Sequence, residues 1–219
     1  MQPVDLITIS REFGAGGSQL AASLGERLGW RVLDHDIAAL VAARLRVPVE
    51  DIEAQDEHAP GLLERLGSVA LRSNPVFAPS LEHDGGPEPD DIAEATRQVL
   101  IDAARAPVVI VGHGGQSLFH DRASALHVRL VAPLAQRVRR ICTRTSCGDA
   151  DAVGLARRMD ADRIAYIRRY YHRDWHDPLL YHLQINTGAV PLSQAAELVL
   201  ALVESRRAEV AGGSQAITE

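Results

Sequence analysis

The chain has 219 residues, 46% of them hydrophobic, and a formal net charge of −6. Length and composition predict one domain, with or without insertions, around a sizeable core. The acidic balance argues against a general nucleic-acid-binding protein, and no apolar run is long enough to span a membrane. Cys142 and Cys147 lie too close together in sequence for a disulfide between them to stabilise the fold, and they lack Cys or His residues at the spacing typical of zinc ligands. We therefore expect reduced thiols in a cytoplasmic protein without a signal peptide.

The most informative stretch lies near the start of the chain. An apolar, β-branched run at residues 4–9 is followed by glycines at positions 14, 16 and 17, and then by a segment of helical period. Strand, glycine turn and helix in this order are typical of a phosphate-binding loop, because the unpaired N–H groups and the dipole of a helix N-terminus favour an anion. Glycines let the backbone approach that anion. A tight turn in an ordinary α/β protein is the alternative interpretation.

The loop departs from the Walker A pattern G-x-x-x-x-G-K-[ST]. With Gly16 on the second glycine, the lysine position is Gly17, the Ser/Thr position is Ser18 and the first glycine position is Arg11. All 23 basic residues of the chain are arginines. A cation on the β- or γ-phosphate must therefore be an arginine, and Arg11 is the nearest candidate.

A second short strand is predicted at residues 30–33, and Asp34 and Asp36 follow it directly. Ligands of open α/β sheets sit beyond the carboxyl ends of the strands. A carboxylate there could hold Mg²⁺ through water or accept a hydrogen bond from a substrate hydroxyl. We expect one of the two aspartates to have such a role and the other to cap the helix predicted over residues 37–44.

Residues 48–97 differ in character from the rest. A weakly patterned, acidic helix is predicted over residues 49–71 and a Pro- and Gly-rich loop over 73–90. We interpret residues 48–97 as a cap inserted between two strands of a single domain (1–205). Arg72, at the centre of the cap, could reach a substrate phosphate or could be a solvated surface residue.

The helix predicted over residues 91–105 is followed by a fully apolar strand at 108–111 and by Gly112-His113-Gly114. This turn again falls on the expected ligand edge. A polar contact from His113 to substrate, or a plain turn, fits better than a catalytic base. A strand at 126–131 and a helix at 134–144 come next.

Residues 155–182 combine arginines with tyrosines. This pattern favours a lid that closes on phosphates, because one guanidinium group can donate two parallel hydrogen bonds to phosphate oxygens. A solvated helix face with ion pairs is the alternative for part of these arginines. A last strand is predicted at 181–185, a helix at 192–205 and a flexible tail at 206–219. The candidate lid arginines are Arg157, Arg158, Arg163 and Arg168.

These pieces, in this order, resemble the cytidylate kinase-like family of nucleoside monophosphate kinases. The resemblance implies an α/β P-loop fold with a five-stranded parallel sheet, helices on both faces, a substrate-binding insertion and a lid. It also implies transfer of the γ-phosphoryl group of ATP to a nucleoside monophosphate, CMP or dCMP above all, with Mg²⁺. The motifs that carry the resemblance are residues 7–17, 33–36, 108–114, Asp160-x-x-Arg163 and 174–187.

Carried over to this chain, the resemblance implies that the glycine loop binds the ATP phosphates and that Ser18 is the Mg²⁺ ligand. Asp34 matches an acid near the monophosphate, and residues 112–114 match a Gly-Arg-Asp stretch that contacts the cytidine nucleotide. Asp160 and Arg163 match the Asp-x-x-Arg of the lid. The predicted phosphate-binding residues are Gly14, Ala15, Gly16, Gly17, Ser18 and Gln19; those for the acceptor are Asp36, Arg72, Gly112, His113 and Gly114.

Three departures from the family pattern keep two alternatives open. Gly17 replaces the lysine, His113 and Gly114 replace the arginine and aspartate, and the lid carries extra aromatic residues. The chain could therefore be a kinase of another small-molecule acceptor, or a nucleotide-binding regulatory protein without catalysis. The expected partner is a nucleotide or another small molecule, bound by a monomer or homodimer.

Overall fold

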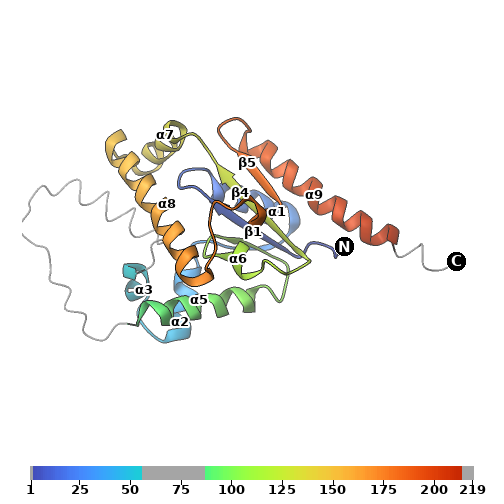
Figure 1. Cartoon of the computed structure of the whole chain (residues 1–219), viewed down its shortest axis with the longest axis horizontal. Coiled ribbons are helices and arrows are strands. Elements are labelled where there is room, and N and C mark those ends of the chain that lie inside the picture. Colours follow the sequence, from blue (N-terminus) through green and yellow to red (C-terminus); the bar gives the residue numbers. More distant parts are fainter. Residues whose placement is uncertain (1, 56–86, 214–219) are drawn as a thin grey trace, which may run out of the picture.

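The computed structural model describes residues 2–55 and 87–213. Its centre is a five-stranded, all-parallel sheet with the strand order β2-β3-β1-β4-β5 (Figure 1). The predicted α/β fold with a parallel sheet is confirmed. Because all strands run the same way, their carboxyl ends share one edge, which carries Arg11, Asp34 and Gly112. The strands are β1 (Leu6–Arg11), β2 (Arg31–Leu33), β3 (Val108–Val111), β4 (Ala125–Val131) and β5 (Leu183–Asn186).

Helices cover both faces of the sheet (Figure 1). One face packs against α1 and α9, and the other packs against α2, α3 and α5. The helices α7 and α8 pack on each other around a third, smaller core beside Phe13. The helices are α1 (Gly17–Leu28), α2 (Ile37–Leu45), α3 (Val49–Gln55), α5 (Pro89–Ala103), α6 (Gly115–Leu118), α7 (Leu134–Thr145), α8 (Asp149–Tyr171) and α9 (Leu192–Gly213).

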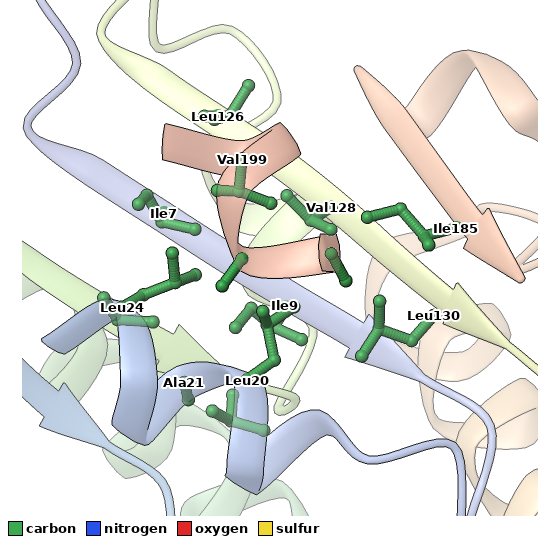
Figure 2. Close-up of a cluster of buried hydrophobic side chains, with 14 of the residues drawn as sticks. Ile7, Ile9, Leu20, Ala21, Leu24, Leu126, Val128, Leu130, Ile185 and Val199 are labelled. Atoms are coloured by element: carbon green, nitrogen blue, oxygen red, sulfur yellow. The ribbon is translucent and has the colours of Figure 1, made fainter. Parts of the chain in front are cut away.

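The alternation of side chains along β1 explains the largest core. Ile7 and Ile9 point to the face covered by α1 and α9, where they meet Leu20, Leu24 and Val199 (Figure 2). Each of these side chains is fully buried. Burial of such a side chain contributes about 1.5–3 kcal/mol. The intervening residues of β1 point to the opposite face.

The start of β5, the end of α9 and the form of the lid segment differ from the predictions. β5 begins at Leu183 instead of residue 181, because Tyr181 belongs to the preceding loop and donates its hydroxyl proton to the carbonyl of Trp175. α9 runs on to Gly213, so residues 206–213 are helical instead of part of an irregular tail. Arg206 fixes this extension by donating to the carbonyl of Ala125. The segment of the predicted lid up to Tyr171 is part of one continuous helix, α8.

The predicted cap is described only at its ends, as α3 and the start of α5, and Arg72 lies outside the described residues. Among the helices of the described ranges, none combines the length and apolar character that crossing a membrane requires.

Candidate functional site

The glycine loop, residues 12–17, joins the end of β1 to the start of α1 at the carboxyl edge of the sheet. Gly14 and Gly16 have φ angles of 84° and 95°, which favour glycine. A Cβ at Gly14 would lie 3.0 Å from the carbonyl oxygen of Arg137, and one at Gly16 would lie 2.8 Å from Leu192 Cδ1. Both glycines are therefore required by conformation and by space.

Side chains from outside the loop donate hydrogen bonds to its backbone carbonyl groups. Arg137 donates to the carbonyl of Phe13 at 3.2 Å, Arg140 to that of Gly14 at 3.3 Å, and the hydroxyl of Thr187 to that of Ala15 at 2.8 Å. In a planar trans peptide the next N–H points the opposite way.

These carbonyl contacts therefore turn the N–H groups of Gly14 and Gly16 inward, together with the N–H groups of the first turn of α1. Ala15 is the exception among the predicted phosphate-binding residues, because its N–H donates to the carbonyl of Glu12 at 3.0 Å. Ser18 lies half-buried in the first turn, whereas the side chain of Gln19 is exposed.

Asp160 supports the same loop. One carboxylate oxygen accepts the N–H of Phe13 at 2.8 Å, and the other lies 2.7 Å from Arg137 Nη1. Arg137 also donates through Nε to the carbonyl of Ala132 at 3.0 Å. The resemblance placed Asp160 in a lid; in the structure its carboxylate binds the glycine loop directly.

The side chain of Arg11 occupies the space that the Cβ of a Walker lysine at position 17 would need. A Cβ at Gly17 would lie 2.8 Å from Arg11 Cγ, and a Cβ at Gly112 would lie 2.0 Å from Arg11 Nη1. The stem of Arg11 thus lies on Gly17 and its guanidinium lies against Gly112. Arg11 Nη2 is 3.9 Å from Asp34 Oδ1, and both side chains are largely buried. Glycine at position 17 makes the room that Arg11 needs.

Arg163 brings a second cation to this place. It is buried, donates from Nη1 to the carbonyl of Arg11 at 2.9 Å, and lies 3.5 Å from Asp160 Oδ1. Its Nε is buried without a hydrogen-bond partner among residues 2–55 and 87–213. Burial, followed by repulsion from Arg11, lowers the pKa of Arg163 well below its usual range. An anion bound beside Arg11 and Arg163 would oppose both effects.

The turn after β3 is strained. Gly112, His113 and Gly114 have φ angles of 78°, 50° and 72°, and His113 is buried. A Cβ at Gly114 would lie 2.3 Å from Cε2 of Tyr171. Left-handed backbone at a non-glycine residue costs free energy and is found most often at functional sites.

Other predicted residues lie away from this cluster. Arg158 and Arg168 are exposed, and each is five residues from Arg163, about 140° around the helix. Asp36 is exposed at the N-cap position of α2, but its side chain makes no capping hydrogen bond, so the expected cap is absent there. The structure thus brings Arg11, Asp34 and Arg163 together and leaves Arg158, Arg168 and Asp36 outside.

The aromatic residues after α8 close over the end of the sheet. Trp175 Nε1 donates to Ser10 Oγ at 2.8 Å, and the Arg129 guanidinium carbon lies 4.6 Å from the Trp175 ring centre and 5.3 Å from that of Tyr181. Ser10, Arg129 and the supporting Arg137, Arg140 and Thr187 were missed from the sequence. The placement of Ser10 and Arg129 just before the ends of neighbouring strands was the available signal.

The order of these features along the chain matches a known family. The sequence profile of the cytidylate kinase-like family matches residues 6–189. The chain belongs to the cytidylate kinase-like family. The predicted family is thereby confirmed.

Individual relatives of this family member match less of its length. A cytidylate kinase from Aeropyrum pernix is 31% identical over 107 residues, which are 49% of this chain and 62% of that protein. A uronate isomerase from Corynebacterium glutamicum is 30% identical over 105 residues, 48% of this chain but 20% of that protein. The match therefore spans about three fifths of one relative and one fifth of the other.

Solved structures support the fold. An uncharacterized protein from Eubacterium ventriosum superimposes with a TM-score of 0.65 and 19% identity, covering 92% of this chain and 99% of that one. A gluconokinase from Sinorhizobium meliloti has a TM-score of 0.54 at 15% identity, with 100% of both chains covered. At such identities the similarity concerns the fold alone.

Proposed function

We propose that the chain transfers the γ-phosphoryl group of ATP to a nucleoside monophosphate, with CMP and dCMP as the first acceptors to test. The observation that carries the proposal is the glycine loop with its carbonyls held outward, next to the buried pair Arg11 and Arg163. Family membership supports the same reaction class.

The residues fit the implied ATP and Mg²⁺. The loop has the glycines and inward N–H groups that a phosphate chain requires. Among the described residues there is no group of three or more His, Cys, Asp or Glu that could hold a metal. Mg²⁺ commonly binds through one or two protein ligands and substrate phosphates. Ser18 would hold it here, and the ion would neutralise charge on the phosphates.

Each residue has a distinct task in this proposal. Arg11 takes the place of the missing lysine and places its cation beside the transferred group. Arg163 adds a second cation and, by bonding the carbonyl of Arg11, fixes the end of β1. Asp34 orients Arg11 and stands at the end of β2, where an acceptor hydroxyl or metal-bound water would lie. Positioning and charge stabilisation are what phosphoryl transfer requires of a protein.

A specific observation favours a second candidate within the same reaction class. Gly114 and His113 stand where the family pattern has an aspartate and an arginine, and the space above Gly114 is filled by Tyr171. This change at the acceptor side is compatible with a different small-molecule acceptor.

The test is ADP formation from Mg-ATP by the purified chain, with CMP, dCMP, UMP, AMP and GMP supplied separately. Turnover that prefers CMP or dCMP supports the proposal. Turnover with a different acceptor only would support phosphoryl transfer but contradict CMP and dCMP as its acceptors. ATP binding without transfer to any acceptor in a broader panel of small alcohols and phosphates would contradict phosphoryl transfer and favour a regulatory role.

A further inference from the structure

A groove of about 510 Å³ lies between α5 and the C-terminal part of α8, beside α6. Its volume is in the range of small-molecule pockets. The α8 side contributes three tyrosines and Arg169, which pairs with Asp90 of α5 at 2.6 Å, and the α5 side is charged. The tyrosines are Tyr166, Tyr170 and Tyr171, and the charged residues of α5 are Asp90, Glu94 and Arg97.

The groove is connected to the catalytic edge through two of its tyrosines. Tyr166 also lines the small cavity beside Arg11 and Arg163. Tyr171 donates its hydroxyl proton to the carbonyl of His113 at 3.4 Å, and its ring occupies the space that a side chain at Gly114 would need. A molecule in the groove would therefore contact Tyr171 at the end that faces the proposed phosphate site.

The two walls suit a flat, polar ring. The Tyr166 ring centre lies 4.9 Å from that of Tyr170 and 6.1 Å from that of Tyr171, with the planes tilted by 55° and 56°. Aromatic faces stack on planar heterocycles, and the space left by Tyr171 over Gly114 limits the size of the ring that fits. Across the groove, Glu94 accepts from Arg97 at 3.0 Å and from Gln98 at 2.8 Å, so this wall offers both charged and amide groups for hydrogen bonds to a ring edge.

We propose that this groove binds the planar heterocycle of the phosphoryl acceptor and that Tyr171, seated on Gly114, determines which ring is accepted. The inference rests on the proposed function and specifies its acceptor as a phosphorylated compound with a flat, nitrogen-containing ring. Burial raises the pKa of Tyr171 to about 12, so its hydroxyl stays protonated and acts as a donor.

The decisive experiment measures binding without catalysis. Calorimetry on the full chain without ATP would use CMP, dCMP, UMP, AMP and GMP as probes. The variants are Tyr171→Leu, which keeps bulk over Gly114 but removes the aromatic face, and Arg97→Ala at an exposed position. Arg105→Ala is the matched control, because Arg105 forms the same type of i,i+3 ion pair, with Asp102, outside the groove.

We expect at least one nucleotide to bind. Tyr171→Leu should weaken that binding at least tenfold and change the order of preference, Arg97→Ala should weaken it about threefold, and Arg105→Ala should leave it unchanged. Absence of binding for all five nucleotides would overturn the inference. Wild-type affinities and preferences in Tyr171→Leu would overturn it as well.

Parallel measurement of ADP formation separates this inference from the proposed function. Nucleotide binding that depends on Tyr171, without transfer, would support the groove and contradict the kinase proposal. Transfer to a nucleotide with an unchanged KM in Tyr171→Leu would support the kinase proposal and contradict the groove.

Discussion

The two faces of β1 and β4 are both buried, but they are built differently. Ile7 and Ile9 meet the aliphatic side chains of α1 and α9 on one face. On the other face, Thr8 bonds His127 at 2.7 Å, and Arg129 lies among aromatic rings with Ser10 beside it. The first face stabilises the sheet through non-directional burial. The second positions the chain around the site through hydrogen bonds that each need a particular partner.

This difference determines how each face tolerates change. An apolar core accepts swaps of similar volume at small cost, whereas a buried polar group that loses its partner costs its full desolvation penalty. Substitutions at the polar contacts and at the loop they support should therefore have large and specific effects.

The largest effect is expected at Arg11, which ends β1 at the carboxyl edge of the sheet. Arg11→Ala should lower kcat about 1,000-fold or more, about 4 kcal/mol, because the cation beside the phosphates is lost. Steady-state ADP formation measures this effect. The control is Arg31→Ala, an exposed arginine of β2. Full activity in Arg11→Ala, with an unchanged unfolding midpoint, would exclude Arg11 from the lysine's role.

The next effect concerns the support of the glycine loop. Asp160→Asn removes the charge between Arg137 and Arg163 and should destabilise the fold by about 3 kcal/mol, because two buried cations lose a carboxylate partner. Urea unfolding measures the loss. Asp162→Asn, on the same helix and half-exposed, should stay within about 0.5 kcal/mol. Equal stabilities of the two variants would show that the Asp160 contacts contribute little.

A third, pH-dependent effect tests the polar face itself. Burial, followed by repulsion from His182, lowers the pKa of His127 to about 4, whereas an unfolded histidine titrates near 6.5. Between these values the unfolded chain binds more protons. Stability from this group is therefore complete above pH 6.5 and is lost as the pH falls toward 4, by up to about 3 kcal/mol.

Urea unfolding from pH 8 to pH 4 would measure this loss in the wild type and in His127→Gln. The acid-dependent loss should be smaller in the variant, even if its stability at pH 8 is lower. Parallel pH curves for the two proteins would show that His127 is not the group responsible.

The smallest effect is expected on the exposed side of α8. Arg158→Ala should change kcat/KM by less than about threefold, because Arg158 points away from the face of α8 that carries Arg163. The same steady-state assay measures it. A hundredfold loss would instead show that α8 rotates or moves during turnover and would return Arg158 to the site.

Local patterns predicted most of the fold. The strand, glycines and helix of residues 4–28 are adjacent in sequence, and Asp34 and Gly112 follow strands whose ends must share an edge in a parallel sheet. The supports of the glycine loop were not predictable in the same way. Arg140 and Thr187 reach Gly14 and Ala15 from 126 and 172 residues away. Before folding, such residues resemble any solvated arginine or turn threonine.

The missed end of α9 has a local explanation. Arg206, Arg207, Ala208 and Glu209 are good helix formers, but the segment from Arg206 on was predicted as a flexible tail because its residues are small and polar. The burial of Arg163 could not be predicted from a helix rich in arginines, because only tertiary contacts distinguish one arginine from the next.

The contact between Arg11 and Gly17 also constrains how this loop can evolve. A lysine at position 17 would place its Cβ 2.8 Å from Arg11 Cγ, so the side chain of a lysine there and that of Arg11 in its present position exclude each other. Gly17→Lys alone should lose activity, and Arg11→Ala alone should too, whereas the double variant should recover part of it. Evolution by single substitutions from a loop with Arg11 and Gly17 to a loop with a lysine at position 17 would then pass through an inactive protein. Turnover of the three variants measures this sign epistasis, and an active Gly17→Lys protein would show that the path is open.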